Sequence, residues 1–294
     1  MANPTYAAIQ QYASALGKVS EKAKNGFLSA IKEIDITDTE QLKRIGKLFL
    51  SKYGLACKEL AAQWYDYCRG LAIGGDYAAE IGEVSSYGIA SGIDSVTAKF
   101  AAGEIAESDY IARLGGLMVK QVYREVQSTI MGNLRGEYNR AIAEGNSAFA
   151  KKIGFCRVPS FDACAFCVLL ASQAFYSISY VNALSAGAKG NEYHDDCRCI
   201  IVPFSDAKKI VGYGDTLKGY VDAYENARDL RSGNDMPEDL KQRIELAKAE
   251  HDEKYKSDME RYQRGEISKS EVIKPWSSVN ANLIVMRYQN PGMR

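Results

Sequence analysis

Residues 37–71 read TDTEQLKRIGKLFLSKYGLACKELAAQWYDYCRGL, and this stretch decides the fold of the N-terminal half of the chain. Its apolar side chains recur at spacings of three and four residues: Leu42, Ile45, Phe49, Tyr53, Ala56, Leu60, Trp64, Tyr67 and Leu71. That repeat places them on one face of a helix of roughly eight turns. Thr37 and Glu40 have the spacing of a capping box, so we expect the helix to begin there.

Helix is also expected on both sides of this stretch. The first proline after Pro4 is Pro159, and proline breaks helix interiors, so the intervening sequence favours long helices. A second helical region is predicted from Ser108 to Phe149. Its apolar stripe consists of Leu114, Leu117, Val119, Val122, Val126, Ile130 and Leu134. The Gly- and Ser-containing segment 70–92 is predicted to be a looser connection with short helical pieces.

The composition changes between residues 155 and 204, where β-branched, aromatic and turn-forming residues become frequent. Residues 155–159 and 199–204 are each predicted to be a short strand. Residues 163–174 are predicted to be a short helix, and residues 180–193 a loop.

The C-terminal part, residues 205–294, returns to a helical pattern. Its segment 240–262 carries charges of both signs, which is typical of a solvated helix or of the flank of a helix bundle. The apolar segment 279–286 is expected to dock on other elements. The predicted fold class is α+β: mainly α-helical, with long N-terminal helices, a small zinc-stapled α/β knot at about 155–204 and a helical C-terminal extension. The predicted regions are 1–107, 108–204 and 205–294.

Charge and composition restrict the function classes. The 294 residues include 37 Lys plus Arg and 37 Asp plus Glu, so the chain as a whole has no electrostatic attraction to nucleic acid or to an anionic membrane. It contains no run of 18 apolar residues, and no membrane-spanning helix is expected. Met1–Leu16 lacks the pattern of a secretory signal, so we expect a cytoplasmic site of synthesis and reduced cysteines.

The cysteines cluster, because five of the seven lie between residues 156 and 199. The cluster contains Cys164-x-x-Cys167 and, after 26 intervening residues, His194-x-x-Cys197-x-Cys199. Thiolates and an imidazole at such spacings are typical ligands of a tetrahedral structural zinc. We therefore predict one structural zinc per chain, held by Cys164, Cys167, His194 and Cys197. Cys199 is the alternative fourth ligand, because residues two apart in a strand face the same side.

The sequence gives less support to a redox, histidine-dependent or phosphate-binding site. A redox role for the Cys164 and Cys167 pair would require a surrounding βαβ pattern, which is missing, so metal binding is favoured. His251 is the other histidine and is expected to be a solvated residue of a charged helix. No Walker-type phosphate loop is present. Cys57 and Cys68 are expected in the core of their helix.

The second helical region also carries a group of basic and aromatic residues. Arg124, Arg135 and Arg140, together with Tyr138 and Asn139, have the composition of a weak nucleic-acid patch. The favoured interpretation is pairing on the helix surface with glutamates of the same helix, which are Glu125, Glu137 and Glu144.

The same part of the chain resembles a known domain. The relevant residues are Arg140, Phe155-Cys-Arg-Val-Pro159, Cys164-Ala-Phe-Cys167, Leu170-Ala-Ser172, Tyr176, Gly190 and His194-Asp-Asp-Cys197-Arg-Cys199-Ile-Ile-Val-Pro203. This block resembles the phage Mu protein F-like domain, and the match is strongest over about 120–204. The sequence departs from the family pattern at Ala174 and Phe175, where Gly is expected before a Tyr-bearing strand.

The resemblance implies a minor capsid protein that acts in head morphogenesis of a tailed bacteriophage. The implied location is the virion, at the capsid interior or portal vertex, after assembly in the host cytoplasm. Implied partners are the phage portal and/or the major capsid protein and, in some members, the packaged DNA; no membrane or small-molecule substrate is expected. The leading interpretation is a structural protein of the virion, and no enzymatic activity is expected. A capsid maturation protease, a zinc hydrolase and a DNA-binding zinc module acting in packaging stay open as alternatives.

Overall fold

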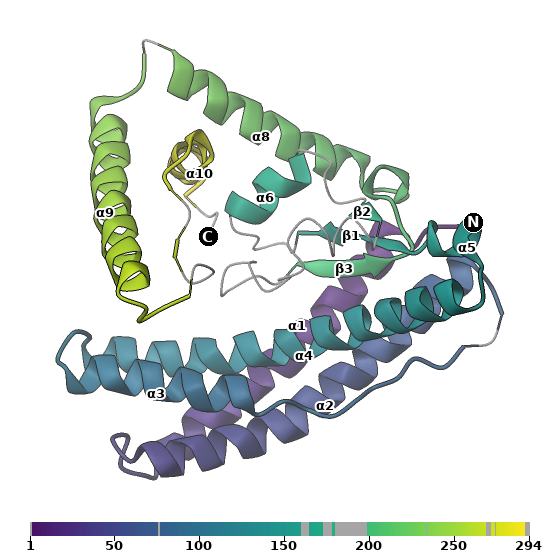
Figure 1. Cartoon of the computed structure of the whole chain (residues 1–294), viewed down its shortest axis with the longest axis horizontal. Helices are drawn as coiled ribbons and strands as arrows, with labels where there is room; N and C mark the ends of the chain where they lie inside the picture. The colour runs from purple at the N-terminus through teal and green to yellow at the C-terminus, as the bar shows by residue number, and fades with distance from the viewer. Residues whose placement is uncertain are drawn as a thin grey trace. The chain divides into compact units, whose positions relative to one another are not determined.

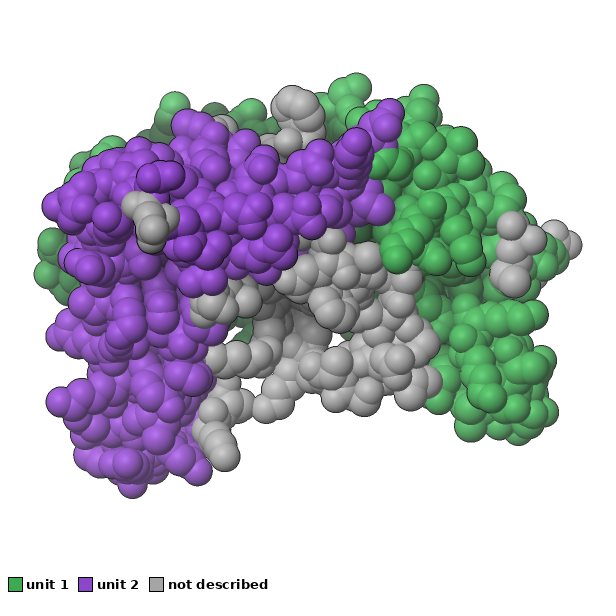
Figure 2. All heavy atoms as spheres, turned by 90° about the horizontal axis from the view of Figure 1, so that it is seen from above, with its two compact units in different colours: residues 1–160, 174–214 green, residues 161–173, 215–294 purple. Residues whose placement is uncertain are grey.

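The structure is a computed structural model of the chain. It describes residues 2–75, 77–159, 165–172, 178–179, 199–233, 235–268, 272–273 and 275–291. The chain divides into two compact units, coloured separately in Figure 2. Unit 1 consists of residues 1–160 and 174–214, and unit 2 consists of residues 161–173 and 215–294.

Unit 1 is built on long helices. They are α1 (Tyr6–Ile31), α2 (Thr39–Ala72), α3 (Tyr87–Ala101) and α4 (Glu107–Ala143), followed by the short α5 (Ser147–Ala150). Helices α1, α2 and α4 pack against one another, and α3 packs against α2 and α4 (Figure 1). The predicted helices over 42–71 and 108–149 are thereby confirmed, the second as α4 with α5. The expected loose connection is shorter than predicted, because α3 begins within it.

The start of α2 differs from the predicted capping box. Asp38 is the N-cap residue, and its carboxylate accepts a hydrogen bond from the backbone N–H of Gln41 at 3.0 Å. The hydroxyl of Thr37 instead bonds to Asp35 at 2.7 Å. Glu40 pairs with Lys43 at 2.9 Å. The prediction was wrong by one residue, because an Asp carboxylate is an effective cap and lay next to the Thr.

A small sheet completes unit 1. Its strands are β1 (Gly154–Val158), β2 (Ile178–Ser179) and β3 (Ile200–Pro203), in the order β2-β1-β3, and both pairs are antiparallel. The two strands predicted from the sequence, β1 and β3, are confirmed, whereas β2 was not predicted. Trp64 of α2 joins helix and sheet, because its indole N–H donates a 2.9 Å hydrogen bond to the carbonyl of Ile201. The Trp64 ring also stacks on Tyr12 of α1.

Unit 2 is helical in its described part. It contains α6 (Ala165–Ser172), α8 (Gly214–Ser232), α9 (Glu238–Gln263) and α10 (Ser278–Gln289). Helix α10 packs against α6 and α9, and the side chain of Asn282 in α10 accepts a 2.7 Å hydrogen bond from Arg231. The helix predicted over 240–262 is confirmed, and the one over 163–174 is confirmed for its described part, 165–172. The segment 279–286, which was expected to dock on other elements, lies in α10 and does so. The predicted loop over 180–193 lies outside the described residues.

The fold class is confirmed as mainly helical with a small sheet, but zinc stapling of the knot is not shown. The division into regions 1–107, 108–204 and 205–294 stays a prediction. Among the helices that the structure describes, none combines the length and apolarity needed to cross a membrane.

Replacing Trp64 with Phe should destabilise unit 1, because the carbonyl of Ile201 loses a buried donor. We expect the free energy of unfolding to fall by about 1–3 kcal/mol. Urea unfolding followed by circular dichroism would measure it. Tyr67→Phe is the control, since Tyr67 is 43% exposed, and it should change stability by less than about 0.5 kcal/mol. Equal effects of the two substitutions on the free energy of unfolding would show that the hydrogen bond between Trp64 and Ile201 does not stabilise the contact between α2 and β3.

Candidate functional site

Helix α4 buries a row of polar side chains beside its apolar stripe. The row consists of Gln121, Glu125, Thr129, Asn133 and Glu137, which follow one another at intervals of four residues. Each of these residues is only 3% or 4% exposed. Side chains at this spacing form a continuous ridge inclined to the helix axis. Buried polar groups need hydrogen-bond partners, so the row shows where α4 must meet other polar groups.

The main partner of the row is the connection between α2 and α3, whose residues 77–86 we call the strap. It has no regular secondary structure and runs back along the helices of unit 1 (Figure 1). The amide of Asn133 pairs with both backbone groups of Glu80, since Oδ1 accepts from its N–H and Nδ2 donates to its carbonyl, each at 2.8 Å. Glu125 accepts a hydrogen bond from the N–H of Ser85 at 3.2 Å. Side chains of α4 thus supply bonds that a neighbouring strand would supply in a sheet.

A buried ion pair joins the row to α2. Lys58 Nζ lies 3.1 Å from a carboxylate oxygen of Glu125, and the two side chains are 5% and 6% exposed. Lys58 also donates to the carbonyl of Ile81 in the strap at 3.3 Å. A buried charge is tolerated only when it is paired and hydrogen-bonded. Helices α2 and α4 and the strap therefore depend on one another at this point.

A second charged cluster lies toward the C-terminal ends of the same two helices. Glu137 pairs with Arg69 and accepts a 2.9 Å hydrogen bond from the hydroxyl of Tyr65. The Arg69 guanidinium lies 4.5 Å from the centre of the Tyr77 ring and donates to the carbonyl of Gly74. Burial, followed by the nearby Glu137 carboxylate, raises the pKa of Tyr65, so its hydroxyl remains a donor.

Just beyond the strap, at the start of α3, Gly88 leaves room for the side chain of Gln121. A Cβ atom on Gly88 would lie 2.4 Å from the side-chain oxygen of Gln121, the first residue of the row. Any larger residue at position 88 would push α3 away from α4 or displace Gln121.

The polar row overturns one expectation about α4. Glu125 and Glu137 were expected to pair on the helix surface with arginines of their own helix, but they point inward and pair with Lys58 and Arg69 of α2. The arginines in question, Arg124, Arg135 and Arg140, are exposed. The sequence carried a signal for this arrangement, since five polar residues at intervals of four lie beside the apolar stripe.

The predicted zinc ligands are only partly described. Cys167 lies in α6 and is 2% exposed, and Cys199 directly precedes β3 and is 3% exposed. Cys164, His194 and Cys197 lie outside the described residues. Within the described ranges, no group of three or more His, Cys, Asp or Glu is placed to hold a metal ion. The burial of two thiols suits a closed structural site, but the ligand set stays a prediction.

Two of the remaining cysteines are core residues, as the sequence predicted. Cys57 and Cys68 of α2 are 0% and 1% exposed. Burial raises the pKa of Cys57 to about 12 and raises that of Cys68 well above its usual value. Both thiols should therefore be unreactive, since the thiolate is the reactive form.

His251 differs from its prediction as a solvated residue. Its ring meets Trp276 edge-on at 5.4 Å between centroids, and its Nδ1 atom is buried without a hydrogen-bond partner among the residues described. The prediction was only partly right, because His251 is half-buried and the ring of Trp276, from the segment after α9, packs against it.

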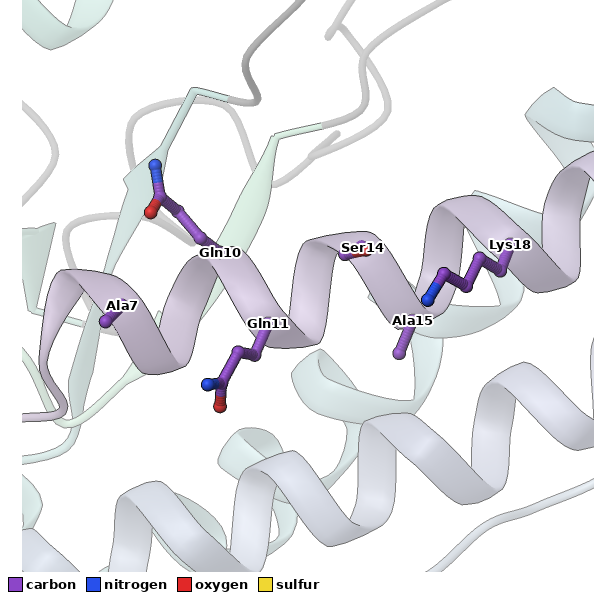
Figure 3. Close-up of a pocket in the computed structure, with 6 residues that line it drawn as sticks. All are labelled: Ala7, Gln10, Gln11, Ser14, Ala15 and Lys18. Carbon is purple, nitrogen blue, oxygen red and sulfur yellow. The ribbon is translucent and has the colours of Figure 1, made fainter.

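A shallow depression lies on the outer face of α1 (Figure 3). Its lining residues are Ala7, Gln10, Gln11, Ser14, Ala15 and Lys18. The side chains of Gln10 and Gln11 point to opposite sides of the helix, so the polar groups do not converge on one point. A binding pocket for a small molecule usually has converging polar groups, and this depression does not have that geometry.

Comparison with known proteins places this architecture in a family. A family model described as VG15 protein matches residues 3–227. The chain belongs to the VG15 family. Membership indicates a viral protein, of phage origin. No curated protein and no solved structure matched the chain. The VG15 match includes every described helix and strand from α1 to β3, and α9 and α10 lie beyond it.

The match does not bear specifically on the Mu protein F-like domain that the sequence resembles. It does cover the polar row, the strap and their partners on α2. We call the polar row of α4, together with the strap and the partners of both on α2, the buried seam. In this VG15 protein the buried seam lies within the part of the chain that the family model matches.

Removing one partner of the buried ion pair should destabilise this VG15 protein strongly. We expect Glu125→Leu to lower the free energy of unfolding by about 3–5 kcal/mol, because Lys58 is left buried without its carboxylate. The double variant Lys58→Met with Glu125→Leu should regain about half of the loss or more, since no buried charge remains. Chemical denaturation of the three proteins would measure this.

The control for this experiment is the exposed pair of Lys248 and Asp252, whose side chains are 55% and 47% exposed. Lys248→Ala should cost about 0.5 kcal/mol or less. A loss for Glu125→Leu that is no larger than the loss in the control would show that the buried pair does not hold the helices.

Proposed function

We propose that the chain is a minor capsid protein of a tailed bacteriophage, which associates with the portal and/or the major capsid protein at the capsid interior during head assembly. The observation that carries this proposal is the VG15 match over residues 3–227, which indicates a phage protein. The resemblance of residues from about 120 to 204 to the phage Mu protein F-like domain suggests the finer assignment.

The chemistry of the polar row supports a structural role. Its charged groups, Glu125 and Glu137, are used in contacts between α2 and α4 and are only 4% and 3% exposed. Tyr65 is likewise held by Glu137. Groups that are occupied in this way hold a scaffold together and are not presented to a substrate. We therefore assign no catalytic residue in this seam.

We also propose one structural zinc per chain, held by Cys164, Cys167, His194 and either Cys197 or Cys199. A site filled by four protein ligands has no open position and stabilises the fold. Metal binding would then contribute to the folding free energy of residues 155–204. The protease, zinc hydrolase and DNA-binding alternatives stay open, and the tests below separate them from the structural role.

The location of the protein tests the proposed function most simply. Mass spectrometry of proheads and virions purified from the phage should recover the chain in particles, in far fewer copies than the major capsid protein. Deletion of its gene should impair head assembly or the infectivity of the particles. Absence from proheads and virions alike would overturn the proposal. If cleavage of capsid proteins also failed without the gene, the protease alternative would replace it.

The zinc proposal has its own test. Elemental analysis of protein purified without chelator should give about one zinc per chain. Cys164→Ser should lower the zinc content and destabilise residues 155–204, whereas helices α1 to α4 stay folded. Cys197→Ser should do the same if Cys197 is the fourth ligand. Cys199→Ser distinguishes the two ligand sets, because a loss of zinc would make Cys199 a ligand. A metal-free chain with the same thermal stability as the zinc-loaded protein would contradict the proposal.

A further inference from the structure

Helix α2 has an unusual distribution of charge. Residues 41–58 contain five basic residues and no acidic residue. Two of the five have partners: Lys43 pairs with Glu40 and Asp94, and Lys58 pairs with Glu125. The other three, Arg44, Lys47 and Lys52, are exposed. No ion pair is formed by these three with any residue that the structure describes.

Two exposed leucines lie among these cations. Leu48 is 68% exposed and Leu55 is 43% exposed. Arg44, Leu48, Lys52 and Leu55 follow at spacings of four, four and three residues, which places them on one side of the helix. We call these four residues, with the neighbouring Lys47, the outer face of α2.

The opposite side of α2 is fully used inside unit 1. Leu50 and Ala61 are 0% exposed, and a Cβ atom on Gly54 would touch Val84 of the strap at 3.2 Å. The side chain of Phe49 leans toward α1, where a Cβ atom on Gly26 would meet its ring. The outer face is thus turned away from α1, α4 and the strap.

The exposed cations and leucines together indicate a partner that has both acidic and apolar side chains. A single exposed leucine is ordinary, but two leucines two turns apart inside a basic face form an amphipathic pattern. A nucleic-acid backbone would use the cations and would leave both leucines in water. An acidic helix with its own apolar side chains would pair with the cations and cover the leucines. The leucines are about 10 Å apart along the axis, which matches the repeat of apolar residues on a facing helix.

We propose that the outer face of α2 docks an acidic amphipathic helix of another protein of the phage particle. The position of that partner in the particle rests on the proposed function, whereas the chemistry of the face does not. Leu48 and Leu55 supply the buried contacts, and Arg44, Lys47 and Lys52 pair with carboxylates at the rim. The rim pairs select the partner and its orientation more than they add affinity.

Binding to proheads that were assembled without this chain tests the proposal. Full-length wild-type protein is added to such proheads, and bound and free protein are separated by sedimentation. Leu48→Ser with Leu55→Ser, and separately Lys47→Glu with Lys52→Glu, should each weaken binding by about tenfold or more. All four side chains are exposed, so the variants should unfold at the same denaturant concentration as the wild type.

Helix α9 provides matched controls, because it lies beyond the family match and carries exposed residues of the same types. Leu246 is 63% exposed, and Lys254 and Lys256 are also exposed. Leu246→Ser and Lys254→Glu with Lys256→Glu should change binding by less than about twofold. A photo-crosslinking residue at position 48 should label, in assembled proheads, a peptide with more Asp and Glu than Lys and Arg.

The possible outcomes separate the two proposals. Wild-type protein that fails to bind proheads would overturn the proposed function, and the docking surface with it. If the wild type and both α2 variants bind equally well, the docking surface is wrong and the proposed function stands. If the lysine variant loses binding to bare duplex DNA and the leucine variant still binds proheads normally, the face is a nucleic-acid site and the proposal is overturned.

Discussion

The ion pair between Lys58 and Glu125 is the contact on which the rest of unit 1 depends. It joins the middle of α2 to the middle of α4 at a position closed to solvent, where an unpaired charge would be strongly destabilising. The same two side chains also bond to the strap, through the carbonyl of Ile81 and the N–H of Ser85. A segment without secondary structure is in this way incorporated into the interior between two helices.

This constraint determines which surfaces of α2 remain available. Because the polar row and the strap occupy one side of the helix and α1 another, the outer face stays exposed, and its cations form no ion pair with the residues that the structure describes. A protein that assembles into a particle needs a rigid element that presents such a surface, since ordering a flexible segment on binding reduces affinity. By fixing α2 against α4, the buried seam would hold the outer face of α2 rigid for the docking that we propose.

The helices and two of the strands could be predicted from the sequence, because the apolar spacing in α2 and α4 and the β-branched residues of β1 and β3 are strong local signals. The polar row was missed because Glu125 and Glu137 lie near arginines in the sequence and have partners that are 67 and 68 residues away. Such pairing depends on how the helices meet and not on the local pattern. The cap at Asp38 was missed for the opposite reason, since adjacent Thr and Asp residues offered two local solutions. The candidate zinc site rests on the sequence pattern, because three of its five residues lie outside the described part of the chain.

Native-state hydrogen exchange of the full-length protein tests the buried seam most directly. The backbone N–H groups of Ala79, Glu80 and Ser85 donate to the side chains of Asp66, Asn133 and Glu125, although the strap has no secondary structure. If the strap belongs to the core of unit 1, these three amides should exchange within about tenfold of the amides at the centre of α4. Exchange at the rate of an unfolded peptide, while the amides of α4 remain protected, would contradict the account.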